Sequence, residues 1–588
     1  MNPNTCAPGN ERIYETRIRS ERRRKAATES GSLNITRCVC TKPCPRRALR
    51  KRKYLASSTP LANQLAYLHI TCQSAVMPDV LSVACRFITT PAILEDPLHL
   101  DLVHRASIQF RTGPAMTFPL VALASAALLL VLFHSLILSP LFLNPLGRIP
   151  GPKLYALTKW RLAKEDWGRR TRTIHALHKQ YGPVVRVGPN ELHFNSVTAL
   201  RTIYGAGSGF ERNSFYSMFD VYGRRNLFTF SSVAAHAKRK RLLAHAYSKS
   251  AITKGHPTTI IRDKIRDFLS ILSESKGSEG LEIFSTLHYY SIDVITTFLY
   301  GTADIGATTA LQGTSEHVSL LFDIMDHSRR RLSWFSVHMP ALASWMYTRT
   351  GLTERLIRPI LPMQKPATYS SIRAHALRAM HNYRDADADS RTKAQDSIIA
   401  RLWKVKDDAG LDELDVASEC ADHLLAGIDT TSDTLMFLIW ALSLPQHAHI
   451  QRKLVDECKS VERIAIKDGL VDLDVADRLP YLDAVIRETL RLYAPLPASE
   501  PRTSPVHTVI DGYSIPRGTV CSVAPYSLHR NVEMFPEPLK WDPERWLRAD
   551  GVTAPPEMRK WWWPFSSGAR MCIGMQSVRL DLSSLSLC

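Results

Sequence analysis

The chain has 588 residues, and 75 Lys and Arg against 55 Asp and Glu give it a formal net charge of +20. A hydrophobic content of 45% lets it bury a large core, and its length alone suggests several domains. Only five of its eleven cysteines lie beyond residue 115, too few and too scattered for a disulfide framework, so a disulfide-built fold is excluded and a reducing cytosol fits.

Residues 1–115 form a basic segment with 18 Lys and Arg against 8 Asp and Glu. The basic runs at 22–25 and 46–53 fit a nuclear or nucleic-acid patch or an Arg-rich transit segment. A second possibility is metal binding by Cys38, Cys40 and Cys44, although no further Cys or His pair completes a tetrahedral set.

The third interpretation of this segment is translated upstream sequence, with the working protein starting at Met116. No hydrophobic periodicity organises residues 1–115, so we expect a disordered or non-native extension and no nucleic-acid partner.

A nearly uncharged run at 116–138, interrupted only by His134, is long enough to cross a bilayer of roughly 30 Å. It is too long for the apolar region of a secretory signal, so we expect a transmembrane anchor. A proline-rich hinge at 139–153 follows, and then a catalytic domain at 154–588. Basic residues after the span at 148, 153, 159 and 161 outnumber Arg105 and Arg111 before it, so the positive-inside rule places the domain in the cytosol.

An apolar stretch from about Asp412 to Pro445 predicts one long helix, stopped by the proline. Gly427, Asp429 and Thr430 interrupt its middle, and such residues cost helix stability. Such a defect in a helix usually has a purpose, and an acid beside an alcohol is suited to relaying protons. Ordinary polar residues filling a kink are the alternative.

Two further helices carry paired charges. In 481–493 the i, i+3 spacing places Glu488 and Arg491 on one helix face, and most such pairs are merely solvated. In 235–243 His236 and Arg239 belong to a basic run that also fits a solvated face.

Near the end of the chain, Phe565-x-x-Gly568-x-Arg570-x-Cys572-x-Gly574 sets one cysteine in a glycine-flanked turn. Glycine lets a backbone approach a flat ligand closely, and a loop of backbone N–H groups keeps a thiolate in place. A buried structural cysteine is the alternative for a lone cysteine, but the number of identities at fixed spacing argues against it.

These patterns together resemble the cytochrome P450 family. The loop is similar to its F-x-x-G-x-R-x-C-x-G signature, 426–431 to A-G-x-(D/E)-T-T, and 543–546 to its P-E-R-(F/W) meander. The motifs occur in family order, so the resemblance implies the cytochrome P450 fold, mainly α with a minor β portion, behind one N-terminal transmembrane helix.

The resemblance also implies a role for each residue. Cys572 would be the axial ligand of a haem iron. The long helix would open at 426–431, so that Thr430 and Asp429 bind dioxygen and relay protons to it. The other assignments are haem contacts by Phe565, Gly568 and Gly574, propionate ligands at Arg570, His236, Arg239 and Arg502, and a structural network of Glu488, Arg491 and Arg545.

The function implied is a haem-thiolate monooxygenase that inserts one oxygen atom of O₂ into a lipophilic small molecule, as in fungal secondary metabolism. Electrons would come from NADPH through a separate NADPH-cytochrome P450 reductase, at the endoplasmic reticulum membrane. The alternatives are a redox-independent isomerase or dehydratase, and a truncated non-catalytic product. Only 14 residues, 575–588, follow the loop, so we expect a C-terminally truncated domain with weak haem retention.

Overall fold

The computed structural model describes residues 114–158, 169–275, 281–313, 317–325, 345, 351–360, 369–461, 466–467, 470–547 and 556–585. The basic segment up to residue 113, with Cys38, Cys40 and Cys44, lies outside the described residues, as do the basic residues at 159 and 161.

The apolar run at 116–138 is helical, and the helix extends beyond both ends of the run. Helix α3 (Pro114–Phe133) continues as the π-helix η2 (His134–Leu143), and the stretch Val121–Leu143 is long and apolar enough to cross a membrane. The helix continues past residue 138, because wider π-type hydrogen bonding accommodates Pro140. One such bond joins the Asn144 N–H to the Ser139 carbonyl at 2.8 Å.

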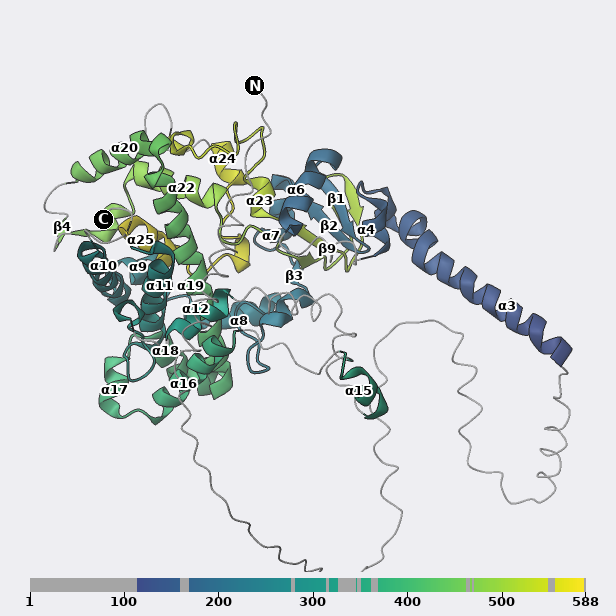
Figure 1. Cartoon of the computed structure of the whole chain (residues 1–588), viewed down its shortest axis with the longest axis horizontal. Coiled ribbons are helices and arrows are strands. Elements are labelled where there is room, and N and C mark those ends of the chain that lie inside the picture. Colours follow the sequence, from purple (N-terminus) through teal and green to yellow (C-terminus); the bar gives the residue numbers. More distant parts are fainter. Residues whose placement is uncertain are drawn as a thin grey trace, which may run out of the picture. The chain divides into compact units, whose positions relative to one another are not determined.

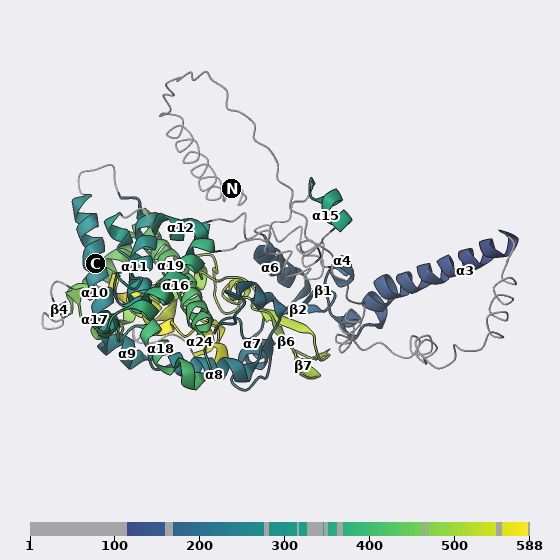
Figure 2. The same cartoon turned by 90° about the horizontal axis from the view of Figure 1, so that it is seen from below.

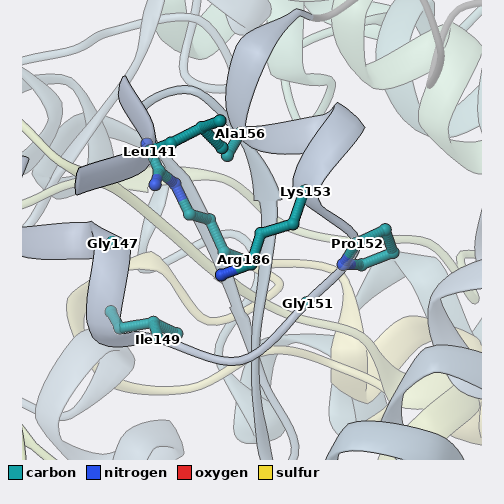
Figure 3. Close-up of a pocket in the computed structure, with 8 residues that line it drawn as sticks. All are labelled: Leu141, Gly147, Ile149, Gly151, Pro152, Lys153, Ala156 and Arg186. Atoms are coloured by element: carbon teal, nitrogen blue, oxygen red, sulfur yellow. The ribbon is translucent and has the colours of Figure 1, made fainter. Parts of the chain in front are cut away.

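The hinge packs against the first strand, β1 (Val184–Gly188). It contains the 3₁₀ turn η3 (Pro145–Arg148) and the short helix α4 (Lys153–Leu157). The buried Arg186 of β1 donates to the Pro140 carbonyl at 2.8 Å and to the Pro189 carbonyl at 2.6 Å. Figure 3 shows its side chain reaching Leu141 in a small hollow at this junction.

The β portion is small. Its main sheet has the strand order β1-β2-β9-β6-β3, with β2 and β9 parallel and the other neighbours antiparallel. Two hairpins, β4-β5 and β7-β8, stand apart from that sheet. The remaining strands are β2 (Glu191–Phe194), β3 (Glu211–Arg212), β4 (Ile466–Lys467), β5 (Leu470–Val471), β6 (Arg502–Thr503), β7 (Thr508–Ile510), β8 (Tyr513–Ile515) and β9 (Val520–Val523).

Helices make up most of the described chain (Figure 1). The first group comprises α6 (Arg170–Tyr181), α7 (Val197–Tyr204), η4 (Ser214–Phe219), α8 (Val233–Leu243), α9 (Lys249–Lys254), α10 (His256–Glu274), α11 (Ile283–Tyr300), η5 (Ala310–Gln312), α12 (Val318–Met325), α15 (Gly351–Ile357), α16 (Ser370–Asp385), α17 (Ala388–Lys393) and α18 (Ile398–Ala409). The second comprises α19 (Glu413–Ser443), η7 (Pro445–His447), α20 (Ala448–Lys459), α21 (Leu473–Ala476), α22 (Pro480–Leu492), α23 (Pro525–Leu528), η9 (Pro543–Trp546), α24 (Pro556–Trp561), η10 (Gly568–Arg570) and α25 (Met575–Leu585). The expected mainly α fold with a minor β portion is confirmed.

The 31-residue helix α19 is the centre of the helical core. A capping box between Asp412 and Asp415 starts it, and Pro445 follows its end. It packs against α11, α16, α18, α20, α22 and α25, and Figures 1 and 2 both show α11 and α16 beside it. At Gly427 a Cβ would lie 2.5 Å from the Ile295 side chain, so glycine permits the close approach of α11.

The helix that follows the cysteine loop is well packed. The sequence of α25 is rich in serine and predicts a weak helix, but Leu580 and Leu582 are buried in the core that α19 and α22 also build. Tertiary packing therefore outweighs local helix propensity in this segment.

Candidate active site

The loop at 565–574 holds Cys572 through backbone hydrogen bonds. The Cys572 N–H donates to the Phe565 carbonyl at 2.9 Å, and the N–H groups of Gly574 and Met575 donate toward the sulfur. Cys572 keeps an exposed surface, yet desolvation by the surrounding protein raises the thiol pKa. The N–H of Gly574 and the positive charge of Lys240 act the other way and favour the thiolate.

The two glycines of the loop have different reasons to be glycine. Gly568 has φ +64°, and a Cβ there would lie 2.3 Å from the Tyr204 carbonyl oxygen, so the fold itself requires glycine. At Gly574 the one atom of the described residues that lies near an added Cβ is the Cys572 sulfur, at 4.0 Å. The space beside the sulfur is therefore open on this side.

Arg570 anchors the loop to the segment before α8. Its guanidinium donates to the carbonyls of Phe230, at 2.5 Å, and Ser231, at 2.6 Å, while its Nε is buried without a hydrogen-bond partner. Burial and the charges of Arg212 and Arg502 lower the pKa of Arg570 to about 9.

His236 lies in the same cluster of positive charge. It is buried on α8, and desolvation followed by the charges of Arg570, Arg212, Lys240 and Arg502 lowers its pKa to about 3. Cations that depress one another's protonation mark a site with unbalanced positive charge, which is suited to an anionic ligand.

Arg502 is buried on β6 and already has partners. It donates to the Tyr216 hydroxyl at 2.5 Å and to the Glu500 carboxylate at 3.2 Å. Glu500 also accepts from Ser566 of the cysteine loop at 2.9 Å. Arg502 therefore reaches the loop through Glu500 and faces the cation cluster.

Arg239, expected beside His236 as a propionate ligand, does not join this cluster. Its guanidinium is buried and pairs with Glu419, and Asp415 lies 4.0 Å away, both on α19. The adjacent Lys240 instead reaches the loop and donates to the carbonyls of Ala569 at 3.0 Å and Met571 at 3.2 Å. Neighbouring side chains on a helix point about 100° apart. The sequence alone did not show which of the two, Arg239 or Lys240, faces the loop.

Asp429 and Thr430 lie in the middle of α19, which stays a continuous α-helix there instead of opening as expected. The Thr430 hydroxyl donates back to the Ala426 carbonyl at 2.8 Å, and Thr434 donates to the Thr430 carbonyl at 2.7 Å. Such hydroxyl bonds satisfy the polar groups inside an intact helix, so no break is needed.

Glu488, Arg491 and Arg545 meet in one buried network. Arg491 binds the Glu488 carboxylate through two bonds of 2.8 Å, and Arg545 adds a third of 3.0 Å. Trp546 and the Asp542 N–H complete the shell of donors, each at 2.9 Å. This network fastens α22 to the η9 turn.

Comparison with known proteins identifies the family of this chain. The family model described as Cytochrome P450 matches residues 149–583. The chain belongs to the cytochrome P450 family.

Curated relatives of this P450 come from several fungi. The cytochrome P450 monooxygenase hkm5 of Aspergillus hancockii is 28% identical over 79% of this chain and 88% of its own length. The cytochrome P450 monooxygenases stcB of Emericella nidulans and tazI of Aspergillus terreus are each 28% identical, over 75% and 78% of this chain and 80% and 88% of their own lengths. The P450 is accordingly an oxidoreductase.

The residues present fit the haem that the P450 family implies. An open space beside the Cys572 sulfur suits an iron, and the excess of positive charge around Arg570 and His236 suits two propionates. The unpartnered Nε atoms of Arg212 and Arg570 are further donors for such an anion.

The fold brings to this P450 site several residues to which the sequence analysis had assigned no role. Arg212 on β3, Tyr216 on η4 and Lys240 join it only through the fold, and Tyr204 supports the loop with its carbonyl, which accepts from Ser567 at 3.3 Å. The charged pair Glu500 and Arg502, split only by a proline, was the one local signal for Glu500.

Proposed function

We propose that this P450 is a membrane-anchored haem-thiolate monooxygenase that inserts one oxygen atom of O₂ into a lipophilic small molecule, in fungal secondary metabolism. The observation that carries the proposal is the Cys572 loop, with N–H donors converging on the sulfur and an open space beside it. When bound, haem supplies the activation of dioxygen.

The loop residues act on the thiolate and on the propionates. Backbone N–H groups of Gly574 and Met575 stabilise the negative sulfur, and Lys240 adds a positive charge nearby. Arg570, Arg502 and the neutral His236 would hold the propionates, while Arg212 adds positive charge behind them. Phe565 fixes the position of the loop through its carbonyl.

Asp429 and Thr430 would handle protons on α19. The Thr430 hydroxyl is held by the Ala426 carbonyl at 2.8 Å and can rotate to donate elsewhere, and Asp429 is partly exposed and so in exchange with water. An intact acid and alcohol favour oxygen activation over the redox-independent isomerase or dehydratase chemistry.

Electrons would come from NADPH through a separate membrane-bound reductase. From residue 116 onward the chain carries ten more basic than acidic side chains, which suits an acidic partner. The apolar helix at Val121–Leu143 supports anchoring in the endoplasmic reticulum membrane with the catalytic domain in the cytosol.

The haem assignment is tested by the spectrum of the reduced carbon-monoxide adduct. The full-length protein in detergent should show the long-wavelength band of a thiolate ligand, and Cys572→His should move it to the shorter wavelength of an imidazole ligand. Cys458→His, at a half-buried cysteine on α20, is the matched control and should keep the wild-type band. A wild-type band at the imidazole position would refute thiolate ligation.

The reaction class is tested by stoichiometry. With a lipophilic substrate that gives a binding spectrum, reductase and NADPH, one labelled oxygen atom from ¹⁸O₂ should enter the product for each NADPH consumed. Product formed without NADPH and without label would support the isomerase or dehydratase alternative instead.

A further inference from the structure

A short strap of chain at 227–231, between η4 and α8, accepts hydrogen bonds from two arginines of the cation cluster. Arg212 donates to two of its carbonyls, that of Leu227 at 3.2 Å and that of the next residue. Arg570 donates to two more, that of Phe230 at 2.5 Å and that of the next residue at 2.6 Å. The strap therefore fixes the position of both guanidinium groups.

Both arginines keep one donor for a further partner. Within the described residues, the Nε atoms of Arg212 and Arg570 are buried without a hydrogen-bond partner. Burial, and then the charge of Arg212, lower the pKa of Arg570 to about 9. Two neighbouring cations repel each other, so they stay close only where the surrounding chain holds them.

Glu419 of α19 holds the strap in place. Its side chain is 0% exposed, and its Oε1 accepts from the Leu227 N–H at 2.9 Å. Its Oε2 accepts from Arg239, whose guanidinium carbon lies 5.2 Å from the centre of the Phe230 ring. One carboxylate thus fixes the strap at two points, one directly and one through a guanidinium.

A second acid of α19 reaches the same strap. Asp422 accepts from the Phe228 N–H at 3.3 Å. This N–H belongs to the same peptide group as the Leu227 carbonyl, which accepts from Arg212. A carboxylate at the N–H end of a peptide group polarises it and makes its carbonyl a stronger acceptor, so the acid side of the strap strengthens the hold on the arginine.

The two acids differ in charge state. Burial raises the pKa of Asp422 to about 7, so it is only partly ionised at neutral pH. Burial also acts to raise the pKa of Glu419, but His423, Arg239 and a backbone N–H outweigh it and lower that pKa. Glu419 is therefore the permanent anion that holds the strap.

We propose that Glu419 is a positioning residue for haem, which holds the strap so that the free Nε–H groups of Arg212 and Arg570 face the propionates. This inference rests on the haem of the proposed function, and Glu419 itself need not touch the haem. By charge alone, removing an acid near an anion site should strengthen the binding of the anion. The proposal predicts the opposite, because the arginines lose their place when the strap is released.

Glu419→Gln tests the proposal. Both carboxylate oxygens accept a hydrogen bond, whereas an amide has one oxygen and one NH₂, so either the Leu227 N–H or Arg239 must face a donor. The full-length protein is loaded with iron protoporphyrin IX, or with its dimethyl ester, in which both propionates are neutral. Transfer of each haem to an excess of a haem-scavenging protein is then followed by absorbance.

Glu419→Gln should lose the native haem about tenfold faster than the wild type, the size expected for one hydrogen bond to a charged group, and lose the dimethyl ester at the wild-type rate. Equal acceleration for both haems would show a merely structural role and overturn the proposal. Slower loss of the native haem would show that charge and not position matters, and would overturn it too.

Two further variants control for folding. Asp293→Asn, at another 0% exposed acid that accepts backbone N–H groups of a loop, at 2.7 Å from Ala310, should change both rates by the same factor. Arg239→Met added to Glu419→Gln frees the amide oxygen for the Leu227 N–H and should slow the loss of native haem again. Loss as fast as in the single variant would overturn the proposal. In all of these outcomes the reduced carbon-monoxide adduct keeps its thiolate band, so failure here leaves the monooxygenase proposal standing.

Discussion

Asp581 should make the protein less stable as pH rises. It lies on α25 and is 4% exposed, and burial raises the pKa of its carboxyl from 3.8 to about 7, against a hydrogen bond from the Tyr290 hydroxyl at 3.2 Å. Between these two values the folded carboxyl keeps a proton that the unfolded one has lost, so the free energy of unfolding falls as pH rises from about 4 to about 7 and then levels off.

The size of the effect follows from the shift. Each pKa unit corresponds to about 1.4 kcal/mol, so a shift of about three units costs about 4 kcal/mol above pH 7. Asp581→Asn cannot ionise and escapes this cost. The variant should therefore have a higher free energy of unfolding than the wild type at pH 8. This advantage over the wild type should be about 2 to 3 kcal/mol larger at pH 8 than at pH 5.

Urea unfolding followed by tryptophan fluorescence measures the difference in free energy of unfolding between Asp581→Asn and the wild type, once at pH 5 and once at pH 8. Asp407→Asn, at an aspartate whose side chain is 85% exposed, is the matched control and should show no such pH dependence. Asp422, whose pKa burial also raises to about 7, is present in both proteins and cancels in the comparison. Equal differences at the two pH values would refute the reasoning.

Two further substitutions probe packing with the same urea assay. Glu488→Gln leaves the Arg491 guanidinium, 0% exposed, without its negative partner, and should cost about 3 to 5 kcal/mol; an unchanged midpoint would contradict a structural role for this network. Gly427→Ala forces a methyl group against Ile295 and should lower the free energy of unfolding by about 1 kcal/mol, after the gain from the better helix propensity of alanine. Adding Ile295→Ala should relieve the clash, and purely additive losses of stability would argue against that contact.

The features that the sequence predicts best are local ones. The loop at 565–574 carries its ligand, its glycines and its arginine within ten residues, so one stretch of sequence contains the whole turn. The long helix is equally local, since Asp412 caps it and Pro445 follows its end. Glu488 and Arg491 share a helix face, and the fold adds Arg545 to them at 3.0 Å.

Features that depend on packing could not be predicted from the sequence. Whether Arg239 or Lys240 reaches the cysteine loop depends on the rotation of α8, and Glu419 from α19 decides it by pairing with Arg239. Proline usually stops a helix, but at Pro140 π-type bonding carries the helix on to Leu143.

The helix around Asp429 shows the same difference between local and tertiary causes. Gly427 was interpreted as a break for oxygen chemistry, yet its contact with Ile295 shows that glycine also allows α11 to pack closely against α19. That close packing is what brings His288 of α11 to within 4 Å of Asp429 and Asp433. Gly427 therefore serves the close packing of α11 against α19, while α19 itself stays unbroken.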